Sequence, residues 1–150
     1  MSDVQVVTAT ARPTAVVAAA TTWDEFPQLW RRLLDQVYAF LATSDVSQTG
    51  HNVMLYRDDV PNVEVGVEVG VEVEASFSSP GPVVSSALPA GEVAMVVHRG
   101  PYERLGSAHE AVLRWCRSNG HEPTGTRWEI YGDWHEDPAQ LETEVHWLLR

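Results

Sequence analysis

The 150-residue sequence is poor in the features that mark several large classes of protein. It has one cysteine, Cys116, so no disulfide can form within the chain, and its position among the apolar residues of a helical pattern predicts a buried, unreactive thiol. It has no run of about eighteen apolar residues that could span a membrane. Its first residues also lack the basic flank and apolar stretch of a secretory signal. We therefore expect a cytoplasmic protein with no membrane partner.

Basic residues are scarce as well. Lysine and arginine together number 10, against 21 aspartates and glutamates, which gives a formal net charge of −11. Such a surface repels the phosphates of nucleic acids and of anionic lipids, so we expect no direct nucleic-acid partner. The charge mildly favours cations over anions as ligands, although many surface carboxylates serve only to keep a protein soluble.

The motifs of common catalytic, phosphate-binding and metal sites are missing too. Ser107 and His109 do not stand in the G-x-S-x-G context of a nucleophilic serine. Gly66 and Gly70 fall inside a strand pattern and precede no helix, which excludes a phosphate-binding loop. Residues 133–137 (DWHED) are of metal-binding types but have no spaced partner, so they predict a structural turn. We expect no metal and no cofactor.

The length and the hydrophobic content of 44% are sufficient for one domain with a real core, so residues 1–150 are predicted to form a single domain. The one obvious linker, at about 75–82, contains the serine-, proline- and glycine-rich stretch SFSSPGP. It separates a first repeat at about 3–74 from a second at about 83–149.

Each repeat is predicted to run strand, helix, strand, strand. In the first repeat, residues 4–20 form two short strands or one bent strand, and apolar residues at helical spacing predict a helix from about Trp23 to Ala42, opened by a Thr22–Glu25 capping box. In the second repeat, a proline at the first helical position and an Asn-Gly pair bound a helix between residues 101 and 119. The remaining predicted strands are 52–57, 63–74, 93–98, 127–131 and 141–149.

Strict alternation makes residues 63–74 the plainest strand. Its valines lie on one side and its glutamates and glycines on the other. Two interpretations stay open: a solvated acidic face over a valine core, or a strand whose Glu64 or Glu68 helps to line a cavity attractive to cations.

The repeated order of elements predicts an α+β fold with pseudo-twofold symmetry. Trp23 and Tyr102 open the two helices, and the segment 55–58 (LYRD) matches 130–133 (IYGD). We expect the two halves to place corresponding strands side by side, with both helices on one sheet face and a ligand cleft on the other.

Strand alternation places Trp128 and Ile130 on one face and Glu129 and Tyr131 on the other. If the helices cover the first pair, the second pair points into the cleft. A carboxylate among apolar groups is costly to desolvate, and an organic cation could offset that cost by charge pairing and ring contacts. In the structural alternative, Glu129 pairs with an arginine or reaches solvent.

Other aromatic and apolar residues complete the predicted cleft. Met54 and Tyr56 occupy the places in the first half that Glu129 and Tyr131 occupy in the second. Trp30 and Trp115 lie on apolar helix faces and are expected in the core. The predicted ligand-binding residues are Glu129, Tyr131, Tyr56, Met54, Tyr102, Trp134, Trp147 and Trp23.

Three segments carry a family resemblance: 98–102 (HRGPY), the helix containing Trp115, and 128–131 (WEIY). They resemble the GyrI-like small-molecule-binding domain, which also forms the effector-binding half of some AraC-type and multidrug-sensing bacterial regulators. In that family two strand–helix–strand–strand repeats enclose a hydrophobic cleft, and a glutamate after the second helix commonly meets lipophilic cations. The resemblance implies that role for Glu129, and a lining role for Tyr131. It is clearest over about residues 88–149, and the whole chain is used by the ligand domain, which leaves no helix-turn-helix for DNA.

Three functions follow. The first is a noncatalytic protein that binds a hydrophobic, cationic or aromatic small molecule for sensing or sequestration. The second is a hydrolase of reactive electrophiles, with Glu129 as general base at a pKa raised by apolar surroundings and Tyr131 or Tyr56 as proton donor. The third is a protein-binding modulator, because GyrI-like proteins have been linked to toxin or gyrase antagonism.

Overall fold

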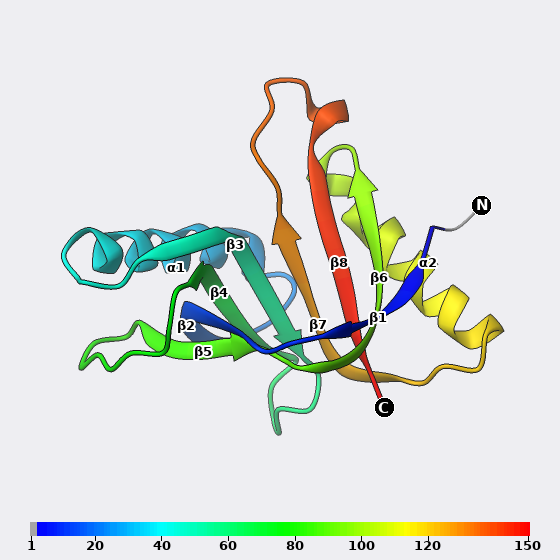
Figure 1. Ribbon diagram of the computed structural model, residues 1–150, viewed down its shortest axis with the longest axis horizontal. Helices are drawn as coiled ribbons and strands as arrows, with labels where there is room; N and C mark the ends of the chain where they lie inside the picture. Colours follow the sequence, from blue (N-terminus) through cyan, green and yellow to red (C-terminus); the bar gives the residue numbers. More distant parts are fainter. Residues whose placement is uncertain (1–2) are drawn as a thin grey trace.

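The computed structural model describes residues 3–150 as one eight-stranded antiparallel sheet that carries two helices (Figure 1). The strands are β1 (Gln5–Ala9), β2 (Arg12–Thr21), β3 (Gln48–Arg57), β4 (Val65–Val73), β5 (Val84–Leu88), β6 (Gly91–Arg99), β7 (Pro123–Tyr131) and β8 (Glu142–Leu149). The helices are α1 (Phe26–Ala42) and α2 (Leu105–Ser118), with short 3-10 turns η1 (Tyr102–Arg104) and η2 (Pro138–Gln140). The expected α+β class is confirmed.

The strand order is β1-β6-β8-β7-β3-β4-β2-β5, so the sheet centre is the pair β3 and β7, one strand following each helix. The edges join segments that are distant in sequence: β1 pairs with β6, and β5 pairs with β2. Residues 4–20 therefore form two strands rather than one bent strand, with the break at Thr10 and Ala11.

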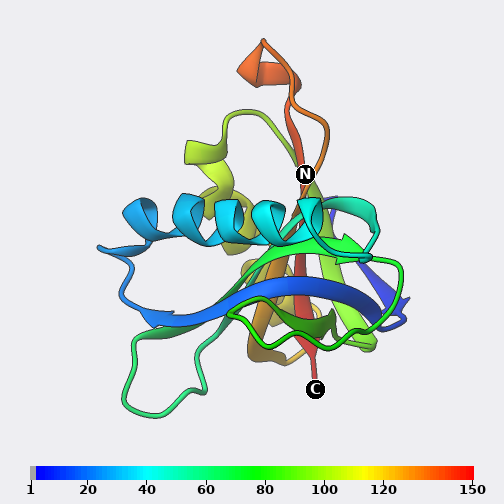
Figure 2. The same ribbon diagram turned by 90° about the vertical axis from the view of Figure 1, so that its left-hand side faces the viewer.

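Both helices lie on the same face of this sheet. Residues that are paired across strands share a face, and one such row runs through Val69, Met54, Glu129 and Val145. Val69 and Met54 belong to the core beneath α1, and Val145 belongs to the core beneath α2. Figure 2 shows α1 lying along β2, which it contacts together with β4.

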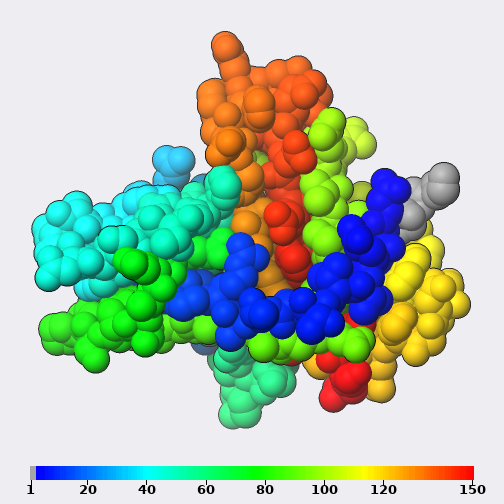
Figure 3. All heavy atoms as spheres, viewed as in Figure 1, coloured from blue at the N-terminus to red at the C-terminus, as the bar shows by residue number. Residues whose placement is uncertain are grey.

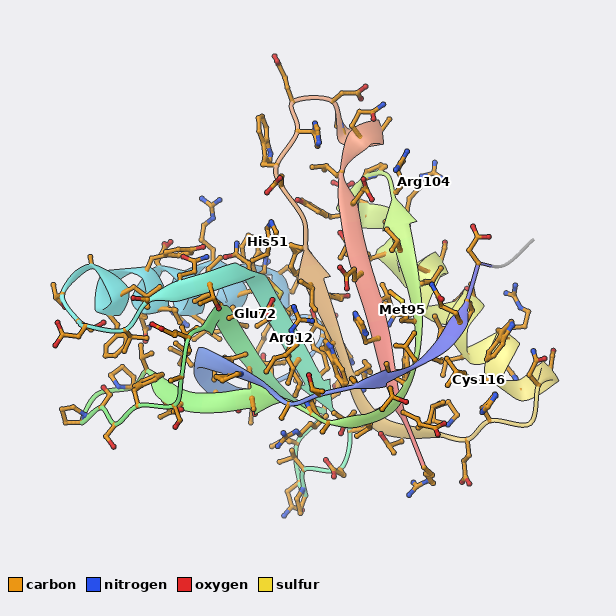
Figure 4. All side chains as sticks on the ribbon, in the orientation of Figure 1. Arg12, His51, Glu72, Met95, Arg104 and Cys116 are labelled. Atoms are coloured by element: carbon orange, nitrogen blue, oxygen red, sulfur yellow. The ribbon has the colours of Figure 1, made fainter. Side chains whose placement is uncertain are left out.

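The valine side of β4 packs against α1 as the alternation predicts, and its five valines are at most 2% exposed. The acidic side is not an open solvated face. Glu72 is 7% exposed and pairs with Arg12 at 2.6 Å (Figure 4), while Glu68 accepts a hydrogen bond from Ser86 at 2.6 Å. Gly70 is required between them, because a β-carbon there would lie 1.8 Å from the carbonyl oxygen of Ala15.

The helix ends differ slightly from expectation. The Thr22 hydroxyl accepts a hydrogen bond from the Glu25 amide, but helical geometry begins only at Phe26. The second helix is preceded by η1 and ends before Gly120, whose φ of 73° favours glycine. Cys116 is buried as predicted. Within residues 3–150, neither helix is both long and apolar enough to cross a membrane.

The opposite face of the sheet is covered by the sheet itself, which corrects the predicted layering. Trp128 and Ile130 pack with residues of β3, β5 and β6, not with the helices. β7 thus points Glu129 and Tyr131 toward the helical side, as β3 does Met54 and Tyr56. Alternation sorts side chains into two faces, but it does not say which face a helix will take, and here the curled sheet covers the more apolar one.

Candidate functional site

A pocket of about 1010 Å³ lies over β3 and β7, between α1 and the η1–α2 segment. This volume suits a drug-sized organic molecule. The sequence predicts a cleft on the sheet face without helices, whereas the structure places this pocket on the helical face. The two helices cover the outer strands of their own halves, so the central strands are left open between them (Figure 1).

Glu129 lies at the floor of the pocket and is 6% exposed. Its Oε1 accepts a hydrogen bond from the Tyr56 hydroxyl at 2.7 Å and another from the Tyr131 hydroxyl. Its Oε2 lies 2.8 Å from Nε2 of His109 on α2. A buried carboxylate is tolerated when it is hydrogen-bonded, and three groups from three elements meet that requirement here.

The hydrogen bond behind His109 fixes the tautomer of its ring. Trp147 of β8 places its indole Nε1 at 3.0 Å from Nδ1 of His109. An indole N–H can only donate, so Nδ1 must be the unprotonated acceptor and the proton of the neutral ring lies on Nε2. His109 therefore donates to Glu129 as a neutral imidazole, and the three hydrogen-bond donors to this carboxylate are uncharged.

These contacts set the protonation states of the cluster. Burial alone would raise the pKa of Glu129, but the hydrogen bonds from His109, Tyr131 and Tyr56, together with the electrostatic attraction of the His109 ring, outweigh burial and hold that pKa below its ordinary value. Burial and the neighbouring carboxylate raise the pKa of Tyr56 and of Tyr131 well above the usual phenol value. At neutral pH the floor is therefore one carboxylate with two protonated tyrosines. The raised pKa expected for a general base at Glu129 is not found.

An arginine does approach the site, but it does not pair with Glu129. Arg127, two residues earlier on β7, binds Asp58 at 2.9 Å. Its guanidinium carbon lies 5.7, 5.6 and 5.1 Å from the ring centres of Trp23, Tyr56 and Trp147. Arg127 is engaged by these rings and by Asp58, so within residues 3–150 no arginine pairs with Glu129.

The pocket brings together most of the predicted residues. Seven of them line it: Trp23, Met54, Tyr56, Tyr102, Glu129, Tyr131 and Trp134. Trp147 does not line the pocket; it is 8% exposed and buried beneath α2, where it holds His109. Trp30, expected only in the core, both packs against the core and lines the pocket.

The role of His109 was not predicted from the sequence. A signal was present, because His109 follows buried Leu105 by four residues and precedes buried Val112 by three, so it lies on the buried stripe of α2. A histidine on such a stripe needs partners inside the protein. The strands that supply them, β7 and β8, are 20 and 38 residues away in sequence.

The segment between β7 and β8 projects from the body of the molecule (Figure 3). Asp133 in this segment pairs with His51 of β3 at 2.9 Å, and both line the pocket. Trp134 beside them is 74% exposed. Asp137 caps η2 through the amide of Ala139, which agrees with a structural turn. Among residues 3–150, no three metal-binding side chains come together.

Comparison with known proteins assigns a family. The model of the GyrI-like small molecule binding domain matches residues 2–150. No curated protein sequence is significantly similar to the chain.

Solved structures share the fold at low identity. The EcmrR C-terminal domain has a TM-score of 0.80 and 20% identity, covering 99% of this chain and 97% of that one. A structure of SAV2435 bound to tetraphenylphosphonium has a TM-score of 0.75 and 10% identity, covering 99% and 94%. A hydrolase from Listeria innocua has a TM-score of 0.63 and 9% identity, covering 98% and 91%.

Proposed function

The chain belongs to the GyrI-like small-molecule-binding family, and from this premise we propose that it binds hydrophobic organic cations in the central pocket, for sensing or for sequestration. The observation that carries the proposal is the state of Glu129. It is a buried carboxylate at the pocket floor whose hydrogen-bond donors are all neutral. Relative to the part of the chain that the structure describes, a ligand with a positive charge would be the first full countercharge to reach it.

The hydrogen-bonding capacity of the Glu129 carboxylate supports this role. An ionised carboxylate offers about four lone-pair positions, and three donors leave part of that capacity unused in a residue that lines the pocket. A unit positive charge about 5 Å away, at an effective dielectric of about 20, would gain on the order of 3 kcal/mol. Part of this gain offsets the desolvation of the ligand.

The surrounding rings supply the apolar contact. Trp23, Tyr56 and Phe26 form one aromatic group at the α1 side, with ring centres 5.3 to 6.0 Å apart. Tyr102 and Tyr131 meet edge to face at 5.6 Å on the other side. Aromatic faces attract delocalised cations, so both sides of the pocket favour the same ligand class. The ligand named for SAV2435 is itself a hydrophobic cation, and it guides the choice of probe.

Pseudo-twofold repeats would account for this arrangement. In this interpretation, β2-α1-β3-β4 and β6-α2-β7-β8 are the duplicated units, and the paired central strands β3 and β7 belong one to each. Met54 and Glu129 are then direct partners across the pair, and one copy contributes a thioether where the other contributes the charge.

Calorimetry with two probes of similar size tests the proposal. Methyltriphenylphosphonium carries a charge, and triphenylphosphine oxide is neutral. We expect Glu129→Gln to weaken binding of the cation by about ten- to hundredfold, because most of a charge interaction of about 3 kcal/mol is lost. Binding of the neutral probe should weaken by less than about threefold. The control is Glu110→Gln, which removes a carboxylate next to His109 in sequence and should change neither. Equal weakening of both probes by Glu129→Gln would remove the charge preference.

Hydrolysis of electrophiles is a second candidate, because two solved structures with this fold are described as hydrolases from Listeria innocua. The local chemistry gives it less support. A general base works best with a pKa near the working pH, whereas the donors around Glu129 lower its pKa. Incubation with electrophilic aromatic compounds separates the two functions: many turnovers that vanish in Glu129→Gln indicate an enzyme, and stoichiometric capture indicates binding alone.

A further inference from the structure

We propose that Trp147 is a positioning residue of this site: its indole N–H holds His109 as the neutral Nε2–H tautomer, so that Glu129 keeps its full negative charge for a ligand. The consequence for ligands rests on the proposed function. The hydrogen-bond relay itself is a property of the free protein, and it can be tested without a ligand.

The relay is built from two buried side chains, Trp147 and Glu129, and the partly buried ring of His109 between them, on three elements. Trp147 on β8 is packed beneath α2 and donates to Nδ1 of His109 at 3.0 Å, with the two rings 5.9 Å apart and edge to face at 75°. His109 then places Nε2 at 2.8 Å from Oε2 of Glu129. Trp147 does not line the pocket, so it can influence a ligand there only through its neighbours, and His109 is the one that reaches Glu129.

The other two states of the ring are opposed by the same geometry. A proton on Nδ1 instead of Nε2 would point two N–H groups at each other and turn a lone pair toward the carboxylate. A proton on both nitrogens would keep the bond to Glu129 but would still leave the two N–H groups of Trp147 and His109 opposed. A buried donor without an acceptor is costly, so the indole N–H disfavours both states.

The doubly protonated state matters because it would cancel the charge of the site. An imidazolium next to Glu129 makes the pair neutral, and an incoming cation would then find no net charge. Histidine ordinarily gains its second proton in the range where cells operate, so a group that keeps His109 neutral extends the pH range in which Glu129 can attract cations.

Charged groups near His109 act in both directions. From β7, Glu129 favours a second proton, while Arg127, whose guanidinium lies 5.1 Å from the Trp147 ring centre, disfavours it. Tyr56 and Tyr131 influence His109 through their hydrogen bonds to Glu129. Other titratable groups lie on α2 and on the elements packed against it. On β6, His98 bonds the Pro101 carbonyl, and on β8, Glu144 and His146 pair with each other. The others include Glu103 and Arg104 of η1, and Glu110, Arg114 and Arg117 of α2.

The test is the substitution Trp147→Phe, which keeps an aromatic ring but removes the N–H. Nitrogen-15 NMR of the His109 ring should show the neutral Nε2–H tautomer in the unmodified protein at pH 7, and on acidification the doubly protonated ring should appear at a higher pH in the variant than in the unmodified protein. The matched control is Trp115→Phe, because Trp115 also contacts a histidine, His121, but by stacking at 5.4 Å. It should leave the His109 signals unchanged.

Ligand binding gives the second measurement. Between pH 8 and pH 5.5, affinity for methyltriphenylphosphonium should stay within about twofold in the unmodified protein and fall by about fivefold or more in Trp147→Phe, as the charge of the pair is cancelled. Triphenylphosphine oxide should show no such fall. Adding His109→Gln to Trp147→Phe should abolish the pH dependence, because an amide can donate to Glu129 but cannot take up a proton.

The outcomes separate the relay from the proposed function. An imidazolium at His109 in the unmodified protein at pH 7, or identical His109 titration in Trp147→Phe, would overturn the relay whatever the ligand results. A failure of Glu129→Gln to discriminate the two probes would overturn the cation preference, and the His109 titration measured by NMR would still decide whether the relay exists.

Discussion

Removal of one hydroxyl tests whether hydrogen bonds to the negative charge of Glu129 stabilise the pocket floor. Tyr56 is 5% exposed, and its hydroxyl donates to Oε1 of Glu129 at 2.7 Å. The substitution Tyr56→Phe keeps the ring between Trp23 and Phe26 and removes only this donor. A hydrogen bond to a charged group contributes about 1.5–3 kcal/mol, so we expect the free energy of unfolding to drop by about that amount at pH 7.

The same substitution should cost less in acid. Because the pKa of Glu129 is lower in the folded protein than in the unfolded chain, its interactions stabilise the fold above the ordinary carboxyl pKa, and this contribution is lost as the pH falls through the lower, folded value. Once Glu129 is protonated, Tyr56 loses only a neutral hydrogen bond, which contributes about 1 kcal/mol. Tyr56→Phe also moves the folded pKa of Glu129 back toward its ordinary value.

Urea unfolding followed by tryptophan fluorescence at pH 7 and at the lowest pH at which both proteins stay folded measures both effects, and the two proteins share every other titrating carboxyl. The matched control is Tyr38→Phe, because Tyr38 is 40% exposed and donates to the neutral side chain of Asn52. We expect it to lose about 0.5 kcal/mol or less at either pH. A Tyr56→Phe penalty of the same size at both pH values would refute the charge argument and would indicate lost packing.

Two further predictions concern the pocket rim and the sheet. Trp134→Ala should weaken binding of methyltriphenylphosphonium, measured by calorimetry, by about three- to tenfold, because one aromatic contact is lost. It should leave the melting temperature unchanged, because Trp134 is 74% exposed. Unchanged affinity would place the ligand away from the rim. Gly70→Ala should lower the free energy of unfolding by more than about 2 kcal/mol, since the added carbon would meet the Ala15 carbonyl at 1.8 Å. A urea midpoint equal to that of the unmodified protein would show that β2 can move aside.

Local patterns predicted the elements well because each depends on neighbours in sequence. The alternation of valine through residues 63–74 predicted β4 to within two residues, and the apolar spacing after Trp23 predicted α1 with a start three residues early. Strand pairing has no such local signal. Nothing in residues 5–9 indicates that they pair with β6, or in residues 84–88 that they pair with β2.

The candidate site divides along the same line. Period-two alternation put Glu129 and Tyr131 on one face, and internal similarity put Met54 and Tyr56 at the equivalent places of the other half. The register pairs Met54 directly with Glu129. The choice of face depends on which surface the curled sheet covers with its own edges. It is therefore a property of the whole fold, and residues 128–131 alone contain no information about it.

The chemistry of Glu129 depended most on contacts that alternation could not reveal. From sequence, a carboxylate in an aromatic cleft suggested a raised pKa and so a general base. The structure supplies three donors from β3, α2 and β7 itself, and these reverse the direction of the shift. An environment that holds a carboxylate ionised makes it a poor proton acceptor and a good partner for a positive charge, so the same hydrogen bonds that stabilise the buried anion favour binding over hydrolysis.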